Sequence, residues 1–150
     1  MKLFESRSES QNVEFKKIWR DEYLQWVCGF ANAQGGTLYI GIDDMGNLVG
    51  VEKAKKLAED IPNKIVSLMG IVPDVNIHKE SGLEYLEIVV KPSNVAISLN
   101  GAYHYRSGAT KQELRGTALQ QFILKKLGMT WDDIVCKGAT LKDIDRKAVA

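Results

Sequence analysis

The sequence predicts an α+β fold in which a mixed, largely antiparallel sheet packs with about three to four helices. Three features support this class. Hairpin turns recur along the chain, and the clearest is the pair Asn100-Gly101 between two extended runs. Apolar residues repeat at helical spacing in other segments. Because hairpins and helices are mixed along the chain, the sheet is not expected to be purely parallel.

The composition is that of one soluble globular domain. The chain has 150 residues, of which 45% are hydrophobic and 26% are charged, which is unlike a disordered protein. No apolar run approaches the roughly 20 residues that a membrane helix needs. The chain start Met1-Lys2-Leu3-Phe4-Glu5 runs straight into charge, which argues against a signal peptide. We therefore expect a cytoplasmic protein without a membrane segment. Two cysteines, Cys28 and Cys136, do not support a disulfide framework.

The first third of the chain predicts strands on either side of a helix. Residues 12–16 alternate between polar and apolar, which predicts a half-buried strand. Asp21 is expected to cap the following helix, which the glycine pair 35–36 ends. The apolar run at 37–42 predicts a central strand, and residues 48–51 are expected to return as its hairpin partner.

The middle of the chain predicts a helix followed by a hairpin. Apolar residues at helical spacing predict a helix over 52–70, with a kink or a break at Pro62. Alternating residues predict strands at 74–78 and 84–90, joined by a turn at 80–82.

The last predicted elements follow the Asn-Gly turn. A long helix is expected from about residue 110 to 127, because Thr110 and Glu113 have the spacing of a capping box. The tail beyond it has no apolar face of its own to bury. We therefore assign residues 1–127 to one domain and residues 128–150 to a linker toward a missing C-terminal domain.

Acidic residues near the first two strands are candidate metal ligands: Glu9, Glu14, Asp43 and Asp44. Carboxylates that converge can hold Mg²⁺ or Mn²⁺, and such an ion can stabilise charge on a phosphate. A structural role is the alternative. Glu14 alternates with apolar neighbours, as on a solvated strand face, and Asp43 and Asp44 precede a glycine, as in a tight turn. On spacing alone the structural interpretation is favoured.

A candidate anion site lies where the last predicted strand leads into the last predicted helix. It contains Arg106, Ser107 and Lys111, and a helix start would add free backbone amides. Arg106 suits a phosphate because its planar fork donates two hydrogen bonds. The alternative is that this segment only starts the helix, through the box of Thr110 and Glu113.

Positive charge gathers locally although the net charge is only +1. Between residues 101 and 126 there are five basic residues and one acid, and Lys111 and Arg115 would share one helix face. Lys16, Lys17 and Arg20 form a second basic cluster. Such local charge suits contacts with a phosphate backbone, and a plain solvated surface is the alternative.

Three separated motifs resemble the Schlafen AlbA-type domain. They read ESQNVEFK at residues 9–16, FANAQGGTLYIGIDD at 30–44 and YRSGAT at 105–110, and the resemblance covers about residues 5–127. It implies a compact α+β domain that binds DNA, as at the N-terminus of bacterial transcriptional regulators. It also implies that further segments follow such a domain.

The same family includes metal-dependent endoribonucleases that act on tRNA and rRNA. The resemblance places Glu9, Glu14 and Asp43 or Asp44 at the positions of their acidic triad. The active Schlafen proteins use a duplicated arrangement with a basic valley, whereas this chain has one copy. As a hypothesis, a homodimer would rebuild the two-lobed valley.

Three functions follow as expectations. The first is a regulator domain that binds DNA (or RNA, with DNA favoured) mainly through phosphate contacts of the basic residues: Arg106, Ser107, Lys111, Arg115, Lys16 and Lys17. The second is an endoribonuclease for structured RNA, with Mg²⁺ or Mn²⁺ held by Glu9, Glu14 and Asp43. The third is a regulatory domain whose anion site binds a small phosphorylated ligand. Only the second requires a cofactor.

Overall fold

The computed structural model describes residues 2–4 and 12–136. Its contacts divide into two compact units. The first holds residues 1–93 and 97–114, and the second holds the remainder of the chain. All strands of the described residues belong to the first unit.

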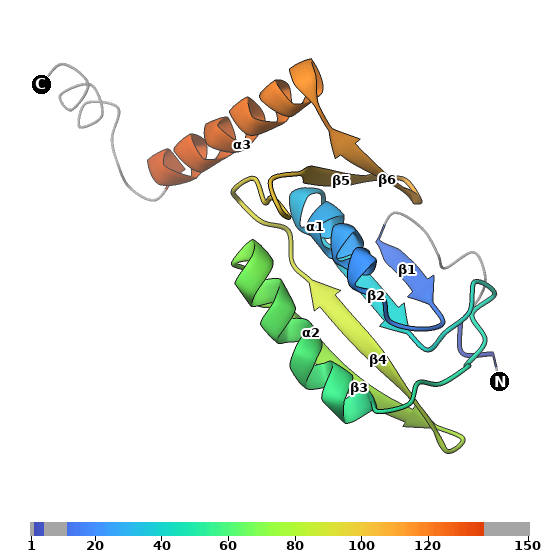
Figure 1. The fold of residues 1–150 in the computed structure, drawn as a ribbon. Helices are drawn as coiled ribbons and strands as arrows, with labels where there is room; N and C mark the ends of the chain where they lie inside the picture. The colour runs from blue at the N-terminus through green and yellow to red at the C-terminus, as the bar shows by residue number, and fades with distance from the viewer. Residues whose placement is uncertain (1, 5–11, 137–150) are drawn as a thin grey trace, which may run out of the picture. The chain divides into compact units, whose positions relative to one another are not determined.

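A four-stranded sheet organises the first unit, with the strand order β1-β2-β4-β3 (Figure 1). β1 runs parallel to β2, whereas β4 runs antiparallel to both β2 and β3. The predicted mixed, largely antiparallel sheet is thereby confirmed. The strands are β1 (Val13–Lys16), β2 (Gly36–Ile40), β3 (Asp74–Glu80) and β4 (Leu83–Val90).

The hairpin of β3 and β4 was predictable because its turn has a defined chemistry. Ser81 and Gly82 both take positive φ, 50° and 79°, which a tight two-residue hairpin turn requires. In contrast, the prediction that residues 48–51 form a strand paired with the strand at 37–42 is wrong. Among the described residues this segment forms no strand. It makes an isolated antiparallel bridge between Ile42 and Leu48, and the amides of Val49 and Gly50 donate to the Gly41 carbonyl at 2.8 and 2.9 Å.

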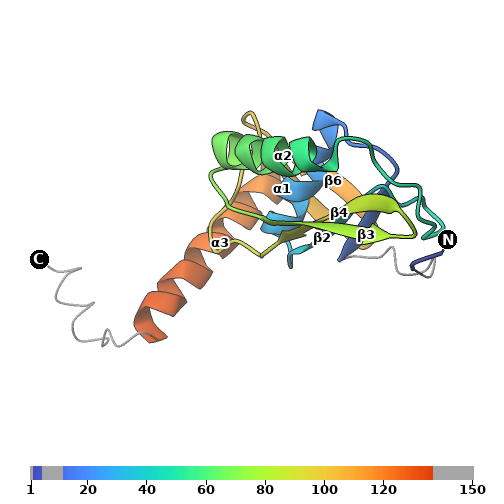
Figure 2. The ribbon, with the colours of Figure 1, turned by 90° about the horizontal axis from the view of Figure 1, so that it is seen from below.

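Two helices, α1 (Leu24–Asn32) and α2 (Ala54–Met69), cover one face of the sheet (Figure 2). Asp21 does not cap α1, because it lies in a short 3-10 turn, η2 (Asp21–Tyr23). Its carboxylate instead accepts hydrogen bonds from Trp19 Nε1 at 2.9 Å and Lys64 Nζ at 2.7 Å. α2 continues through Pro62 as one helix, without the predicted break.

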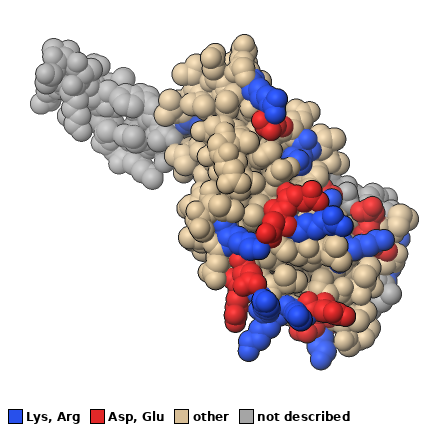
Figure 3. Space-filling model, viewed as in Figure 1, with Lys and Arg blue, Asp and Glu red and all other residues tan. Residues whose placement is uncertain are grey.

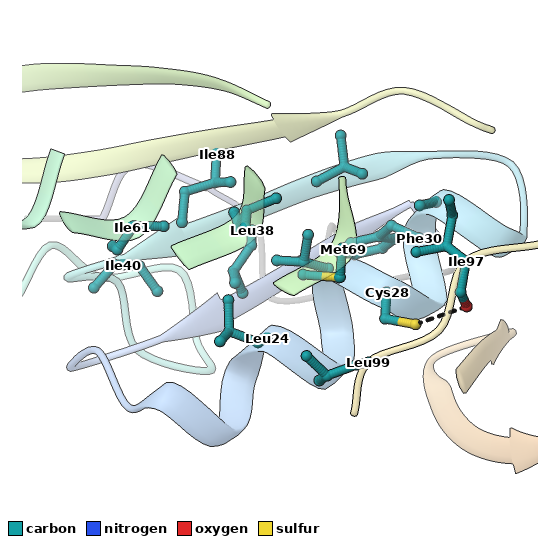
Figure 4. Close-up of a cluster of buried hydrophobic side chains, with 14 of the residues drawn as sticks. Leu24, Cys28, Phe30, Leu38, Ile40, Ile61, Met69, Ile88, Ile97 and Leu99 are labelled. Carbon is teal, nitrogen blue, oxygen red and sulfur yellow. Dashed lines mark hydrogen bonds between the residues drawn. The ribbon is translucent and has the colours of Figure 1, made fainter. Parts of the chain in front are cut away.

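The main hydrophobic core lies between the helices and the sheet (Figure 4). Strand residues pointing to this face interdigitate with the apolar rows of α1 and α2, which removes them from water. A smaller cluster covers the opposite face of the sheet, around Phe15 and Tyr85. The labelled core residues are Leu24, Cys28, Phe30, Leu38, Ile40, Ile61, Met69, Ile88, Ile97 and Leu99.

Two residues of the motif at 30–44, Asn32 at the end of α1 and Gly36 at the start of β2, have structural roles. The Asn32 side chain, 1% exposed, donates to the carbonyls of Ile97 and His104 at 2.8 and 2.7 Å and accepts from the Ile97 amide at 2.7 Å. A Cβ on Gly36 would lie 2.4 Å from ring carbons of Phe30. Asparagine and glycine are therefore required here by hydrogen bonding and by close packing.

A separate two-stranded sheet replaces the predicted start of the last helix. It consists of β5 (Tyr103–Ser107) and β6 (Thr110–Leu114). Thr110 and Glu113 therefore do not form a capping box, and no helix N-terminus supplies amides at this point. Thr110 Oγ1 instead donates to the Ser107 carbonyl at 2.7 Å, across the hairpin turn. Residues spaced for a cap can also be a strand, and pairing with β5 decides between the two here.

The second unit contains one long helix, α3 (Gly116–Cys136). It begins six residues after the predicted start at 110 and continues through residue 127, where the domain boundary is predicted. No helix in the described part of the chain has the length and the apolar character to cross a membrane.

Candidate nucleic-acid interface

Three cationic side chains surround the ring of Trp26 on α1. Arg106 Cζ lies 4.6 Å from the ring centroid, Lys16 Nζ 5.3 Å and Lys111 Nζ 6.0 Å. These distances fall within the reach of cation–π attraction, which extends to about 6 Å. We call Lys16, Trp26, Arg106 and Lys111 the Trp26 cluster.

Strand register explains why these residues meet. Lys16 is paired with Ile40, a residue of the core beneath the helices, so its side chain leaves β1 on the helix side of the sheet. Arg106 and Lys111 are opposite one another in the pairing of β5 with β6, so they share a face. The sequence places Lys16 and Lys111 in two separate basic clusters, and the fold brings both to Trp26.

Arg106 is an internal residue and not an exposed phosphate contact, so that expectation is wrong. Its side chain has no exposed surface. Nη1 donates to Glu14 Oε2 at 2.8 Å, Nη2 to the Val13 carbonyl at 3.0 Å and Nε to the Gly108 carbonyl at 3.1 Å. These bonds tie β1 to the tip of the β5–β6 hairpin.

Two aromatic rings and a carboxylate compensate the buried guanidinium. Its central carbon lies 4.6 Å from the centroid of Trp26 and 4.9 Å from that of Phe30. Glu14 is only 3% exposed, which corrects the expectation of a solvated strand face. A buried ion pair tolerates the loss of neither partner, because an unmatched charge would remain in a poorly hydrated site.

The lysines of the cluster are half-buried. Lys16 Nζ also lies 4.9 Å from the ring centroid of Tyr23. Lys111 Nζ donates to Gln25 Oε1 on α1. Lys17, the next residue after β1, is exposed. The aliphatic stems can pack against the rings while the ammonium groups stay near water.

Two other predicted contacts are not part of this cluster. Ser107 is exposed at the end of β5. Arg115 is exposed and belongs to the second compact unit. The helix face that Lys111 and Arg115 were expected to share does not exist, because Lys111 lies in a strand.

Trp26 and Gln25 were missed by the sequence reasoning. Trp26 lies in the predicted first helix but off the apolar row that faces the core. A large aromatic residue on the polar side of a helix is unusual enough to mark a surface for attention. The sequence therefore contained a signal for Trp26, but it did not show which residues would surround the ring.

Asp43 stabilises its own turn. Its carboxylate accepts hydrogen bonds from the amides of Asn47 at 2.8 Å and Met45 at 2.9 Å, and from Asn47 Nδ2 at 3.2 Å. These bonds, the Asn47 amide first, lower the pKa of the Asp43 carboxyl. Asp44 is exposed.

The described acids do not fit a divalent-metal centre. Glu14 is engaged by Arg106, and Asp43 is engaged by its turn. Within residues 2–4 and 12–136, no group of three or more potential ligands among His, Cys, Asp and Glu is placed to hold a metal ion. Glu9, the remaining predicted ligand, lies outside the described residues.

His104 lies beside the cluster on β5 and is 5% exposed. Burial, reinforced by the charge of Lys111, lowers the pKa of its imidazole, and Glu113 opposes that shift. Its Nδ1 atom has no hydrogen-bond partner within the described chain. The neutral ring is therefore the form that this site accommodates.

The face of the molecule shown in Figure 3 does not carry a uniform positive field. On the face shown in Figure 3, basic and acidic side chains are interspersed rather than gathered by sign. This distribution agrees with the net charge of +1. Any attraction for an anion must therefore come from local groups such as the Trp26 cluster.

The solved structures that are similar to this chain include the following two. The DIP2311 protein from Corynebacterium diphtheriae matches 69% of this chain with 23% identity and a TM-score of 0.57, but the match covers 25% of that protein. The N-terminal domain of a RecG-related protein from Nitrosomonas europaea matches 69% of this chain and 83% of that domain, with 22% identity and a TM-score of 0.48. The first of these supports the fold.

The family assignment rests on a longer and more specific match. Residues 9–115 match the family described as Schlafen, AlbA_2. That range includes the three motifs of the sequence and the strands and helices of the first unit from β1 to β6. This chain belongs to the Schlafen, AlbA_2 family.

Proposed function

We propose that the first unit binds nucleic acid through sugar–phosphate contacts made by Lys16, Lys17 and Lys111. The observation that carries the proposal is the convergence of Lys16 and Lys111, from distant segments, on the ring of Trp26. The chain also belongs to the Schlafen, AlbA_2 family, and the resemblance to that family implies DNA binding, which supports the same function. Ammonium groups suit this task because they act as compact charges on phosphate oxygens.

Arg106 and Glu14 have a positioning role in this proposal. Their ion pair holds β1 against the β5–β6 hairpin, and each of these elements carries a lysine of the interface. The pair contributes no net charge, so the attraction for phosphate comes from the lysines. Phosphate contacts of this kind give affinity with little sequence readout.

The family resemblance favours DNA over RNA as the ligand. We further propose that the domain belongs to a bacterial transcriptional regulator and that it acts as a homodimer. A nuclease is not proposed. Two positions of the acidic triad, Glu14 and Asp43, lie among the described residues, and they are engaged by Arg106 and by a turn.

Fluorescence anisotropy with short labelled DNA, single-stranded and duplex, tests the proposal at several ionic strengths. Three phosphate contacts predict that affinity falls roughly 40-fold between about 50 and 200 mM salt on a duplex. K16A and K111A should each weaken binding and flatten the salt slope by about one contact. Lys79→Ala, an exposed lysine on β3, is the matched control and should bind like wild type. Absence of binding, or a response independent of salt, would overturn the proposal.

A further inference from the structure

A groove of about 430 Å³ opens beside the start of α1. Its apolar side chains are Leu24, Leu68 and Leu99, from α1, α2 and the turn before β5. Glu22 and Asn100 also line it. A volume in the range of about 300 to 1,000 Å³ suits a small organic group.

Two of the charged residues that line the groove form an ion pair with each other. Lys64 Nζ lies 2.7 Å from Asp21 Oδ1, and both residues belong to the lining. With Lys64 paired to Asp21, Glu22 leaves the lining with a net negative charge, so the groove itself is not suited to a phosphate. An apolar floor with amide and carboxylate groups instead matches a flat heterocycle, whose faces are apolar and whose edge carries donors and acceptors.

Gln25 joins the groove to the proposed interface. Its side chain lines the groove, and its Oε1 atom accepts a hydrogen bond from Lys111 Nζ. A phosphate bound at Lys111 would therefore lie beside Gln25, a residue that also lines the groove. Both features belong to the first compact unit.

We infer that the groove receives an unpaired nucleobase of the strand whose phosphates contact Lys16 and Lys111. The inference rests on the proposed function and narrows its substrate to nucleic acid with a single-stranded or extruded nucleotide. The leucine side chains contact the face of the base. Gln25 and Asn100 both line the groove, and their side-chain amides supply groups of the kind that recognise the edge of a base.

The test compares a single strand with the same strand carrying abasic sites, by anisotropy at low salt. The wild-type chain should bind the intact strand roughly tenfold more tightly, because contacts to a base add to the phosphate contacts. L68W fills the groove, and Leu68 is already 43% exposed, so the change is tolerable for folding. It should abolish the preference for the intact strand and leave the affinity for the abasic strand unchanged.

Two further variants control this result. Val49→Trp introduces the same ring at a site that is 44% exposed and outside the groove, and it should keep the preference. N100G removes an amide but suits the backbone there, because Asn100 has φ of 51°; it should reduce the preference. Equal affinity of the wild-type chain for intact and abasic strands would overturn the groove inference and leave phosphate binding standing. Failure to bind either strand would overturn both.

Discussion

Glu14 on β1 and Arg106 on β5 form a buried ion pair of 2.8 Å across 92 positions of sequence. The sequence predicts a separate role for each residue, with Glu14 as a metal ligand and Arg106 as a phosphate contact. The pair shows that each instead satisfies the other. Two of the motif residues that were predicted to have functional roles, Glu14 and Arg106, therefore stabilise the fold.

Replacement of one partner of this pair should destabilise the fold strongly. Glu14→Gln leaves the Arg106 guanidinium without its carboxylate in a buried site, and Arg106→Met leaves the carboxylate buried without its cation. Each should lower the free energy of unfolding by about 3–5 kcal/mol. The double variant should lose less than the sum of the two, which urea denaturation of all four proteins will measure. Simple additivity would show that the pair is not coupled.

The folded chain should lose stability in mild acid because of His104. Its pKa is lowered on folding, by burial first and by Lys111 second, while the unfolded ring has its ordinary pKa of 6.5. As the pH falls below that value, the unfolded state takes up a proton that the folded state resists, so stability decreases until the folded pKa is passed. Thermal denaturation between pH 8 and pH 5, about the range over which histidine titrates, will measure this. His104→Leu should have a shallower decrease, and an unchanged slope would contradict the assignment.

Gly36→Ala should destabilise the first unit through steric overlap. The added Cβ would lie 2.4 Å from two ring carbons of Phe30 and 2.8 Å from the Asn12 carbonyl oxygen. Displacing a buried ring and backbone at this site should cost about 1–3 kcal/mol. Gly128→Ala is the matched control, because the described chain has nothing within 4 Å of the position that its new methyl group would take, and helix propensity favours alanine. Chemical denaturation that ranks the two variants equally would refute the packing argument.

Asn32→Asp should be more harmful than its nearly identical shape suggests. The side-chain nitrogen donates to two carbonyls, at Ile97 and His104. An aspartate presents a second acceptor to those oxygens, so two hydrogen bonds become repulsive contacts in a buried site. A loss above about 2 kcal/mol is expected from the cost of buried groups without partners. Asn32→Ser, which keeps a donor, should lose less, as differential scanning calorimetry can determine.

Local patterns sufficed for most of the architecture. Alternation predicted β1, β3 and β4, and the turn at Ser81-Gly82 predicted the hairpin of β3 and β4, because a two-residue turn with positive φ has few other solutions. The helix predicted to start at residue 110 is wrong, because the residue types of a capping box also occur in short strands such as β6 (Thr110–Leu114). Neighbouring β5 decided that segment through backbone pairing, which no local window contains.

The α+β class, the β3–β4 hairpin and the family could all be inferred before any coordinates, because periodicity, turn chemistry and three ordered motifs are local properties of the chain. The roles of the charged residues could not. Whether Arg106 meets water or Glu14, and whether Lys16 lies near Lys111, depends on contacts between segments far apart in the first unit. The behaviour of a charge depends on its surroundings, since burial and a facing partner convert a candidate ligand into a structural ion pair.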